Sequence, residues 1–318
     1  MVRIGGVGFG LPRVALNWFS MAEMRHDARE DANLETWSKP EVASYYSSLE
    51  YLTPCEKLLF DEYLKPGMAI LDLGVGGGRT TPYLSSLASR YLGADYSAEM
   101  IAACRQKFPG LEFATVDAAD LSLFAASTFD AVVMAFNTID NLIPDESRYR
   151  AWREVHRVLK PDGVLIFSSH NIQSIFVRPS WNPKRLERLA RQLAGDSGLY
   201  RPLLWTLTGS RIAVAVLQSL AKSLARVAKR APTRGFWRGG GYLVDNSHGW
   251  TKIHFAIPER VEHELSEFGF FGRRVLGDDY PRASRRLVTD WYYYVFSKKQ
   301  PPPGLENQSC RSVSARLR

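Results

Sequence analysis

The sequence has few cysteines and no long uncharged apolar run. Its three cysteines, Cys55, Cys104 and Cys310, are odd in number and far apart, which argues against a disulfide framework or a zinc site and favours a reducing compartment. No segment reaches the roughly 18 uncharged apolar residues that a membrane-spanning helix needs. The N-terminus also lacks the basic and apolar regions of a secretory signal. We therefore expect a cytoplasmic protein, either soluble or peripheral to a membrane.

Positive charge is confined to one part of the chain. The net charge is +8, and between Lys184 and Arg238 twelve Lys or Arg residues stand against two acids, which gives +10. The remainder therefore carries about −2. Any electrostatic attraction to an anionic partner is expected from this segment.

Elsewhere, buried-type strands alternate with helices. Strands are expected over 68–74, 90–96, 111–121, 129–137, 164–171, 272–279 and 290–299, with helices between most of them. Ser97 is a plausible N-cap for the helix that follows the second strand. This alternation predicts a doubly wound α/β fold with a seven-stranded, mostly parallel sheet and a helical insertion after the fifth strand.

The same pattern divides the chain into five segments. We expect an N-terminal tail and helical cap, a cofactor-binding core, a basic helical insertion, the C-terminal part of the core and a disordered tail. Their bounds are 1–54, 55–170, 171–250, 251–298 and 299–318.

A glycine-rich loop follows the first strand, in "AILDLGVGGGRTTPYLSS". Its pattern is G-x-G-x-G through Gly74, Gly76 and Gly78, whereas a pyrophosphate loop of the G-x-G-x-x-G type would need glycine at Arg79. Asp72, two residues before the first glycine, suits a cationic ligand better than a pyrophosphate. The loop therefore favours a nucleoside-type ligand that carries positive charge.

Several ordered motifs then resemble the class I S-adenosylmethionine-dependent methyltransferases. They are "ILDLGVGGGRTTPYLSS", "YLGADYSAEMI", "VDAADL", "FDAVVMAFNTIDNL" and "WREVHRVLKPDGVLIFSSHN", and the resemblance covers residues 68–170 and resumes over about 254–298. Among these enzymes, the sequence looks most like bacterial methyltransferases that act on small molecules, sugars or lipid-linked intermediates.

The resemblance implies S-adenosylmethionine as cofactor and a role for each matching residue. Asp72 would lie towards the methionine ammonium, Asp95 would accept the ribose hydroxyls, and Asp117 would accept the adenine amino group. The other implied cofactor residues are Gly74, Gly76, Gly78, Tyr96, Met100, Ala118, Phe136 and Asn137. Asp120 competes with Asp117 for the adenine role, and Tyr96 and Met100 are equally compatible with ordinary packing.

Of all the site residues, the base that removes a proton from the methyl acceptor is the one that the sequence defines least. His170 ends the fifth strand and has a side chain that titrates near neutral pH, and Asp140 follows the fourth strand at the same edge of the sheet. We take both as catalytic candidates, ahead of Asn141, His248 and His254. No spacing of Cys, His and acidic residues predicts a metal site.

The basic insertion contains an amphipathic helical pattern. Apolar residues in 211–231 recur at spacings of four and three, with basic residues on the opposite side. This pattern fits a lid over the catalytic domain, and it also fits a surface, within 184–238, that meets anionic membrane lipid or a polyanionic carrier. Nucleic-acid binding is less well supported because aromatic residues are not interleaved as a stacking platform.

Two other functions are alternatives to a methyltransferase with a small-molecule or lipid-linked acceptor. A non-catalytic scaffold of the same fold would not need Asp72, Asp95 and Asp117 together. A nicotinamide-dependent oxidoreductase is disfavoured by Asp72 and Arg79. The sequence does not define the oligomeric state.

Overall fold

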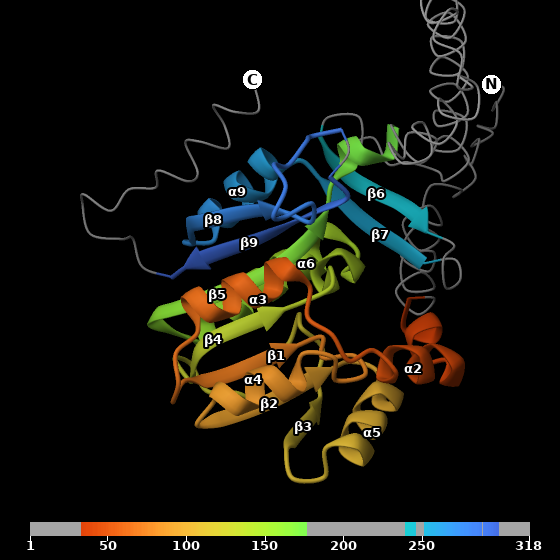
Figure 1. Cartoon of the computed structure of the whole chain (residues 1–318), viewed down its shortest axis with the longest axis vertical. Coiled ribbons are helices and arrows are strands. Elements are labelled where there is room, and N and C mark those ends of the chain that lie inside the picture. Colours follow the sequence, from red (N-terminus) through yellow and green to blue (C-terminus); the bar gives the residue numbers. More distant parts are fainter. Residues whose placement is uncertain (1–32, 177–238, 246–250, 288, 299–318) are drawn as a thin grey trace, which may run out of the picture.

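The computed structural model describes residues 33–176, 239–245, 251–287 and 289–298. Their main feature is a seven-stranded sheet of order β3-β2-β1-β4-β5-β9-β8 (Figure 1). Only β9 runs antiparallel to its neighbours, which confirms the predicted mostly parallel α/β fold. The strands are β1 (Ala69–Leu73), β2 (Arg90–Asp95), β3 (Glu112–Thr115), β4 (Phe129–Met134), β5 (Leu159–His170), β8 (Phe271–Gly277) and β9 (Trp291–Ser297).

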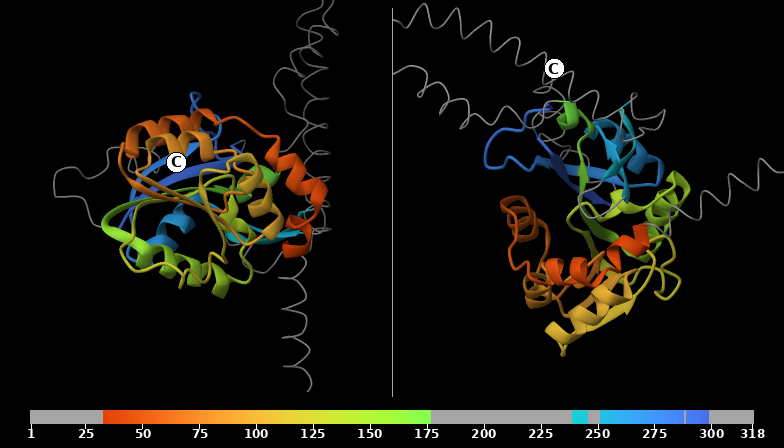
Figure 2. Two further views of the ribbon diagram at one scale, coloured as in Figure 1. Left: turned by 90° about the horizontal axis from the view of Figure 1, so that it is seen from below. Right: turned by 90° about the vertical axis from the view of Figure 1, so that its right-hand side faces the viewer.

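Helices cover both faces of this sheet (Figure 2). One face carries α3 (Pro54–Tyr63), α4 (Thr81–Leu87) and α5 (Ala98–Lys107), and the other carries α6 (Asp145–Val158) and α9 (Pro258–Glu267). The central strands therefore read as continuous apolar runs, since both of their faces are buried.

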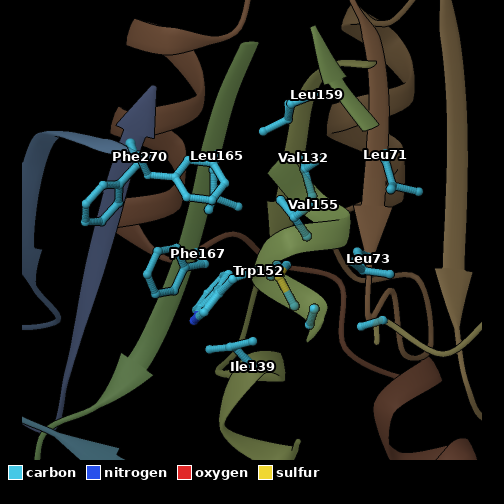
Figure 3. Close-up of a cluster of buried hydrophobic side chains, with 14 of the residues drawn as sticks. Leu71, Leu73, Val132, Ile139, Trp152, Val155, Leu159, Leu165, Phe167 and Phe270 are labelled. Atoms are coloured by element: carbon cyan, nitrogen blue, oxygen red, sulfur yellow. The ribbon is translucent and has the colours of Figure 1, made fainter. Parts of the chain in front are cut away.

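Side chains of each central strand alternate between two hydrophobic clusters. Leu71, Val132 and Leu165 pack with Trp152 and Val155 of α6 (Figure 3). Their neighbours along the strands, including Ile70, Ala131 and Ile166, pack on the opposite face against α3, α4 and α5. This period of two follows from strand geometry. It places Asp72 of β1 on the sheet face that α3, α4 and α5 cover. There the Tyr91 hydroxyl donates a hydrogen bond to the Asp72 carboxylate.

Local capping defines where two of these helices begin. Ser97 caps α5, because its hydroxyl accepts a hydrogen bond from the Met100 N–H at 3.2 Å, which confirms the predicted N-cap. Thr53 and Glu56 form a reciprocal capping box at the start of α3. Both helices thus begin at fixed positions beside the glycine-rich loop.

The N-terminal part of the described chain forms a short helical cap. Residues 33–37 are helical and lead into α2 (Pro40–Ser47). Val42 and Ala43 of α2 pack on Met100 of α5. The cap therefore lies against the element that follows β2.

The end of the predicted helical insertion differs from expectation. Gly240–Asp245 (β6) and Thr251–Ala256 (β7) form a separate two-stranded antiparallel sheet, although we expected helical or hinge structure up to 250 and sheet core from 251. β7 is buried on both faces, so its sequence lacks the clean alternation that marks a half-buried strand. Figure 1 shows this pair beside the end of β5.

Several predictions lie outside the described residues. They are the tails at 1–32 and 299–318, the whole basic segment 184–238 with the amphipathic pattern 211–231, and His248. At the start of the insertion, a 3₁₀ helix, η2 (Ile172–Phe176), follows β5.

Candidate cofactor pocket and His–Asp pair

A cavity of about 290 Å³ lies at the carboxyl ends of β1, β2, β3 and β4. β1 is the strand at which the order of the sheet reverses, the usual ligand position in an open α/β sheet. Loops after these strands and the cap line the cavity, through Asn33, Leu34, Trp37, Tyr46, Leu73, Gly74, Val75, Gly76, Gly77, Arg79, Thr80, Asp95, Tyr96, Met100, Val116, Asp117, Ala118, Ala135, Phe136, Thr138, Asn141, Leu142, Ile143, Ser147 and Arg150.

Two glycines let the loop after β1 approach neighbouring segments closely. Gly74 has φ +76°, and a Cβ there would lie 2.1 Å from the Thr138 side chain. A Cβ on Gly77 would lie 2.3 Å from the backbone nitrogen of Ser47 in α2. The loop is therefore tightly fitted between the β4 exit and the cap, and neither position tolerates a side chain.

Asp95 is buried at the end of β2 and oriented by backbone donors. Its carboxylate accepts the Gly76 N–H at 2.9 Å and the Ser97 N–H at 3.0 Å. Burial raises its pKa, and these N–H groups act in the opposite direction. The side chain is thus fixed on the wall of the cavity, with acceptor capacity left on both oxygens.

Asp72 lies beneath the glycine loop and is not among the lining residues. Its Oδ2 accepts hydrogen bonds from Thr80 Oγ1 at 2.7 Å and Tyr91 OH at 3.0 Å. Its buried Oδ1 has no hydrogen-bond partner among the described residues. Burial raises the pKa of Asp72 to about 6. This carboxylate would be stabilised by a cation or donor brought close to Oδ1.

The residues after β2 and β3 form the other end of the cavity. Tyr96, Met100, Asp117 and Ala118 all line it, and Met100 is 3% exposed. The Asp117 carboxylate accepts the Ala119 N–H at 2.8 Å. Asp120, the competitor named above, is not among the lining residues. The geometry therefore favours Asp117 over Asp120 at this site.

The chain turns sharply after β4. Phe136 and Asn137 have φ of +56° and +62°, a left-handed conformation that is unfavourable for residues with a side chain. The Asn137 N–H donates to Ser168 Oγ at 2.8 Å, which holds the turn against β5. Phe136 lines the cavity, whereas Asn137 turns towards β5 and is not among the lining residues.

His170 and Asp140 are paired next to this turn. Asp140 lies in η1 (Thr138–Asn141) and is fully buried, and its Oδ2 is 2.7 Å from both the backbone nitrogen and Nδ1 of His170. Its Oδ1 accepts from Ser169 Oγ at 2.7 Å. His170 Nε2 lies 3.3 Å from Asn137 Nδ2. Two residues predicted from different strand ends are therefore in direct contact.

Asp140 is kept ionised although it is buried. Burial acts to raise its pKa, but the hydrogen bond from His170 and the nearby His254 ring outweigh burial, and the pKa of Asp140 lies below its ordinary value. His254 in β7 has its Nδ1 3.8 Å from Asp140 Oδ1, and burial together with the Arg148 charge lowers the pKa of His254. The carboxylate thus faces a neutral His254 and can stabilise positive charge on His170.

Arg79 was noted in the sequence only as a departure from a pyrophosphate loop. It makes two hydrogen bonds to the Glu56 carboxylate, at 2.5 and 2.7 Å, and one to the Tyr51 carbonyl at 2.8 Å. Its guanidinium also lies 4.5 Å from the centre of the Phe136 ring. Arg79 therefore joins the glycine loop to α3 and to the turn after β4.

The predicted site residues fall into two groups. Those that line the cavity are Gly74, Gly76, Asp95, Tyr96, Met100, Asp117, Ala118 and Phe136, and those that do not are Asp72, Gly78, Asn137, Asp140 and His170. Sequence reasoning missed the cap residues Asn33, Leu34, Trp37 and Tyr46. The only sequence signal in that segment was its aromatic residues, and no local pattern predicted that it lines a cavity.

The described residues contain neither a metal-ligand cluster nor a candidate membrane-spanning helix. No group of three or more His, Cys, Asp or Glu side chains there is arranged to hold a metal ion. None of the described helices has the length and apolar character needed to cross a membrane.

Comparisons with known proteins agree with this architecture. Residues 71–167 match the family model of a methyltransferase domain. A solved S-adenosylmethionine-dependent methyltransferase from Methanosarcina mazei is 20% identical and has a TM-score of 0.50, over 80% of this chain and 100% of that one. Residues 71–167 thus match a methyltransferase domain, within a fold similar to that of a solved S-adenosylmethionine-dependent methyltransferase.

Curated relatives resemble only part of the chain. An uncharacterised protein of Methanocaldococcus jannaschii is 30% identical over 137 residues, which is 42% of this chain and 51% of that protein. A demethylmenaquinone methyltransferase of Beutenbergia cavernae is 31% identical over 119 residues, 37% of this chain and 45% of that protein. The match thus spans about half the length of these relatives.

Proposed function

We propose that this chain transfers the methyl group of S-adenosylmethionine to an oxygen or nitrogen atom of a small-molecule acceptor, with His170 as the base. The observation that carries the proposal is the His170–Asp140 pair, which contacts Asn137, the residue next to Phe136 on the wall of the cofactor cavity. This contact supports a base next to the proposed cofactor site.

The cavity suits a cofactor that carries positive charge and many donors. Asp72 Oδ1 and Asn141 Oδ1 are buried acceptors without a partner among the described residues. The cation nearest the glycine loop, Arg79, is already neutralised by Glu56. Bound S-adenosylmethionine would supply a sulfonium-activated methyl group and an ammonium group. Unsatisfied buried acceptors and excess carboxylate favour such a ligand over a pyrophosphate.

Each cofactor residue then takes a defined part. Asp95 would accept the ribose hydroxyls, Asp117 would accept the adenine amino group, and the Ala118 backbone N–H would donate to the adenine ring. Tyr96 and Met100 would pack against the adenine. Gly74 and Gly76 line the methionine end, with Asp72 behind them and Gly78 shaping the turn.

The hydrogen bonds of His170 define which of its ring nitrogens can accept a proton. Because Asp140 is a carboxylate at 2.7 Å, His170 Nδ1 must carry the proton. His170 Nε2 is then the acceptor, and it faces the Asn137 amide nitrogen, which donates. An acceptor hydroxyl or amine that displaces the Asn137 amide from Nε2 can give up its proton there, while Asp140 stabilises the imidazolium that forms.

Aromatic rings surround this base. The centres of the Phe255 and Trp291 rings lie 5.0 and 6.1 Å from that of His170, and Phe136 lies 5.9 Å from Trp291. These rings favour an acceptor with an apolar or planar body beside its reacting group. A sugar or lipid-linked acceptor, with membrane contact through the basic segment 184–238, is the alternative that rests on charge alone.

The test uses purified protein, methyl-labelled S-adenosylmethionine and an extract of the source cell, separated into organic, aqueous and macromolecular fractions. Label in the organic or aqueous fraction supports a small-molecule acceptor, and label only in the macromolecular fraction would contradict it. Label in the organic fraction would favour a lipid-like acceptor and an interfacial role for the basic segment. Label in the aqueous fraction alone would favour a water-soluble metabolite. Absence of label from every fraction would contradict the proposed activity.

His170→Gln in the same assay tests the base. Loss of general base catalysis is expected to lower transfer by about 10²–10⁴-fold, while affinity for S-adenosylhomocysteine stays within about twofold, because His170 does not line the cavity. The matched control is His263→Gln, which changes an exposed histidine of α9. Equal transfer by the wild type and His170→Gln would remove His170 from the mechanism.

A further inference from the structure

Asn33 makes an unusual set of contacts for a side chain so near the start of the described chain. It is 3% exposed, and its amide nitrogen donates to the backbone carbonyls of Asn141 at 3.1 Å and Lys252 at 3.0 Å. Its Oδ1 accepts the Lys252 N–H at 3.0 Å. The side chain thus pairs with both backbone groups of Lys252 as a neighbouring strand would.

These contacts join three elements that meet at the cavity. Asn141 belongs to η1, which also carries Asp140, and Lys252 belongs to β7, which also carries His254. The cap segment, residues 33–47, supplies Asn33, Leu34, Trp37 and Tyr46 to the cavity wall. The hydrogen bonds of Asn33 therefore connect this part of the cavity wall to η1 and β7.

The opposite side of the cap segment is fastened independently to α5. Ser97 Oγ donates to the Trp37 carbonyl at 3.2 Å, and Lys107 Nζ donates to the Ser47 carbonyl at 2.8 Å. Val42 and Ala43 pack on Met100. With α5 as one attachment and Asn33 as the other, the cap segment spans the cavity from the β2 side to the β4 side.

We propose that Asn33 is a positioning residue of the cofactor site, which holds the cap segment closed over bound S-adenosylmethionine so that release requires the Asn33 contacts to break. Breaking them leaves the backbone groups of Lys252 and the carbonyl of Asn141 without the partner they have in the closed structure, which makes opening unfavourable. This inference rests on the proposed cofactor, and it adds the residue that controls how long the cofactor stays.

The test measures release of S-adenosylhomocysteine from immobilised full-length protein. Asn33→Ala, and the nearly isosteric Asn33→Asp, which removes both amide donations, are each expected to release it at least tenfold faster than the wild type. Glu35→Ala is the matched control, since Glu35 is exposed in the same helical turn and is expected to leave the rate unchanged. Release from both Asn33 variants within twofold of the wild-type rate would overturn the inference.

Hydrogen exchange of the wild type gives a second measurement that does not depend on a variant that folds. The Lys252 amide, which donates to Asn33, is expected to exchange at least tenfold more slowly when S-adenosylhomocysteine is saturating. Unchanged exchange with ligand demonstrably bound would overturn the inference alone. If the wild type binds no S-adenosylhomocysteine at all, the proposed function fails as well.

Discussion

At the scale of single residues, Asp95 connects the fold to the proposed cofactor most directly. Its two oxygens are oriented by Gly76 and Ser97 and keep free acceptor capacity towards the cavity. Asp95→Ala removes two charge-assisted hydrogen bonds to the ribose, each worth about 1.5–3 kcal/mol. We expect at least a tenfold weaker affinity for S-adenosylmethionine, measured by equilibrium dialysis. Unchanged affinity would refute this assignment.

Ionisation of Asp72 is expected to have opposite effects on folding stability and on cofactor binding. Its pKa is raised to about 6, so the folded state holds the proton more tightly than the unfolded chain does. Stability is therefore lost as pH rises through about 6, and at pH 7 ionisation of Asp72 costs up to about 3 kcal/mol. Asp72→Asn is expected to match or exceed the wild type in free energy of unfolding at pH 7, measured with urea.

The same carboxylate should make cofactor binding depend on pH. Ionised Asp72 attracts the methionine ammonium, so wild-type affinity for S-adenosylhomocysteine is expected to rise as pH increases from 5 to 7, the range around a pKa of about 6. Asp72→Asn should bind at least tenfold more weakly at pH 7 and lose this dependence. A variant that binds like the wild type across the range would show that Asp72 is only structural.

At the scale of elements, the glycine loop is held to α3 by a buried ion pair. Arg79 and Glu56 have side chains only 7% and 2% exposed, and removing one partner of such a pair leaves a buried charge. Glu56→Ala is expected to destabilise the protein by about 3–5 kcal/mol in urea unfolding. Lys57→Ala, in the exposed Lys57–Asp61 pair of the same helix, should have little effect. Equal stabilities of the two variants would contradict this account.

The strands that the sequence predicted are those whose signal is local. β1, β4 and β5 are apolar runs buried on both faces, and Ser97 directly precedes the helix it caps. β6 and β7 were missed because β7 is also buried on both faces but contains polar residues, including His254. Their pairing depends on tertiary contact with β5 and η1, which no local pattern encodes.

The candidate site likewise contains residues that a local sequence pattern predicts and residues whose role depends on contacts far along the chain. Gly74, Asp95 and Asp117 follow strand ends, so their spacing marked them, and the structure brings all three to one cavity. The contact between His170 and Asp140 spans 30 residues, and the residues were predicted without their pairing. Asn33 contacts residues 108 and 219 positions away, so nothing in its own neighbourhood could have indicated its role.

At the scale of the whole molecule, the cavity is built from segments far apart in the chain. The cap segment, the carboxyl ends of four strands and η1 all contribute to it. A ligand bound there contacts each of these segments and is absent from the unfolded state. Binding is therefore expected to stabilise the whole described fold rather than one element.

The measurement that tests the central claim most directly is thermal and urea unfolding of the full chain while S-adenosylhomocysteine is titrated. At about 100 times the dissociation constant, the account predicts a gain of roughly 2.7 kcal/mol in the free energy of unfolding. Reduced nicotinamide dinucleotide at the same concentration should give no gain. No stabilisation by S-adenosylhomocysteine, or stabilisation by the nicotinamide cofactor instead, would contradict the methyltransferase assignment.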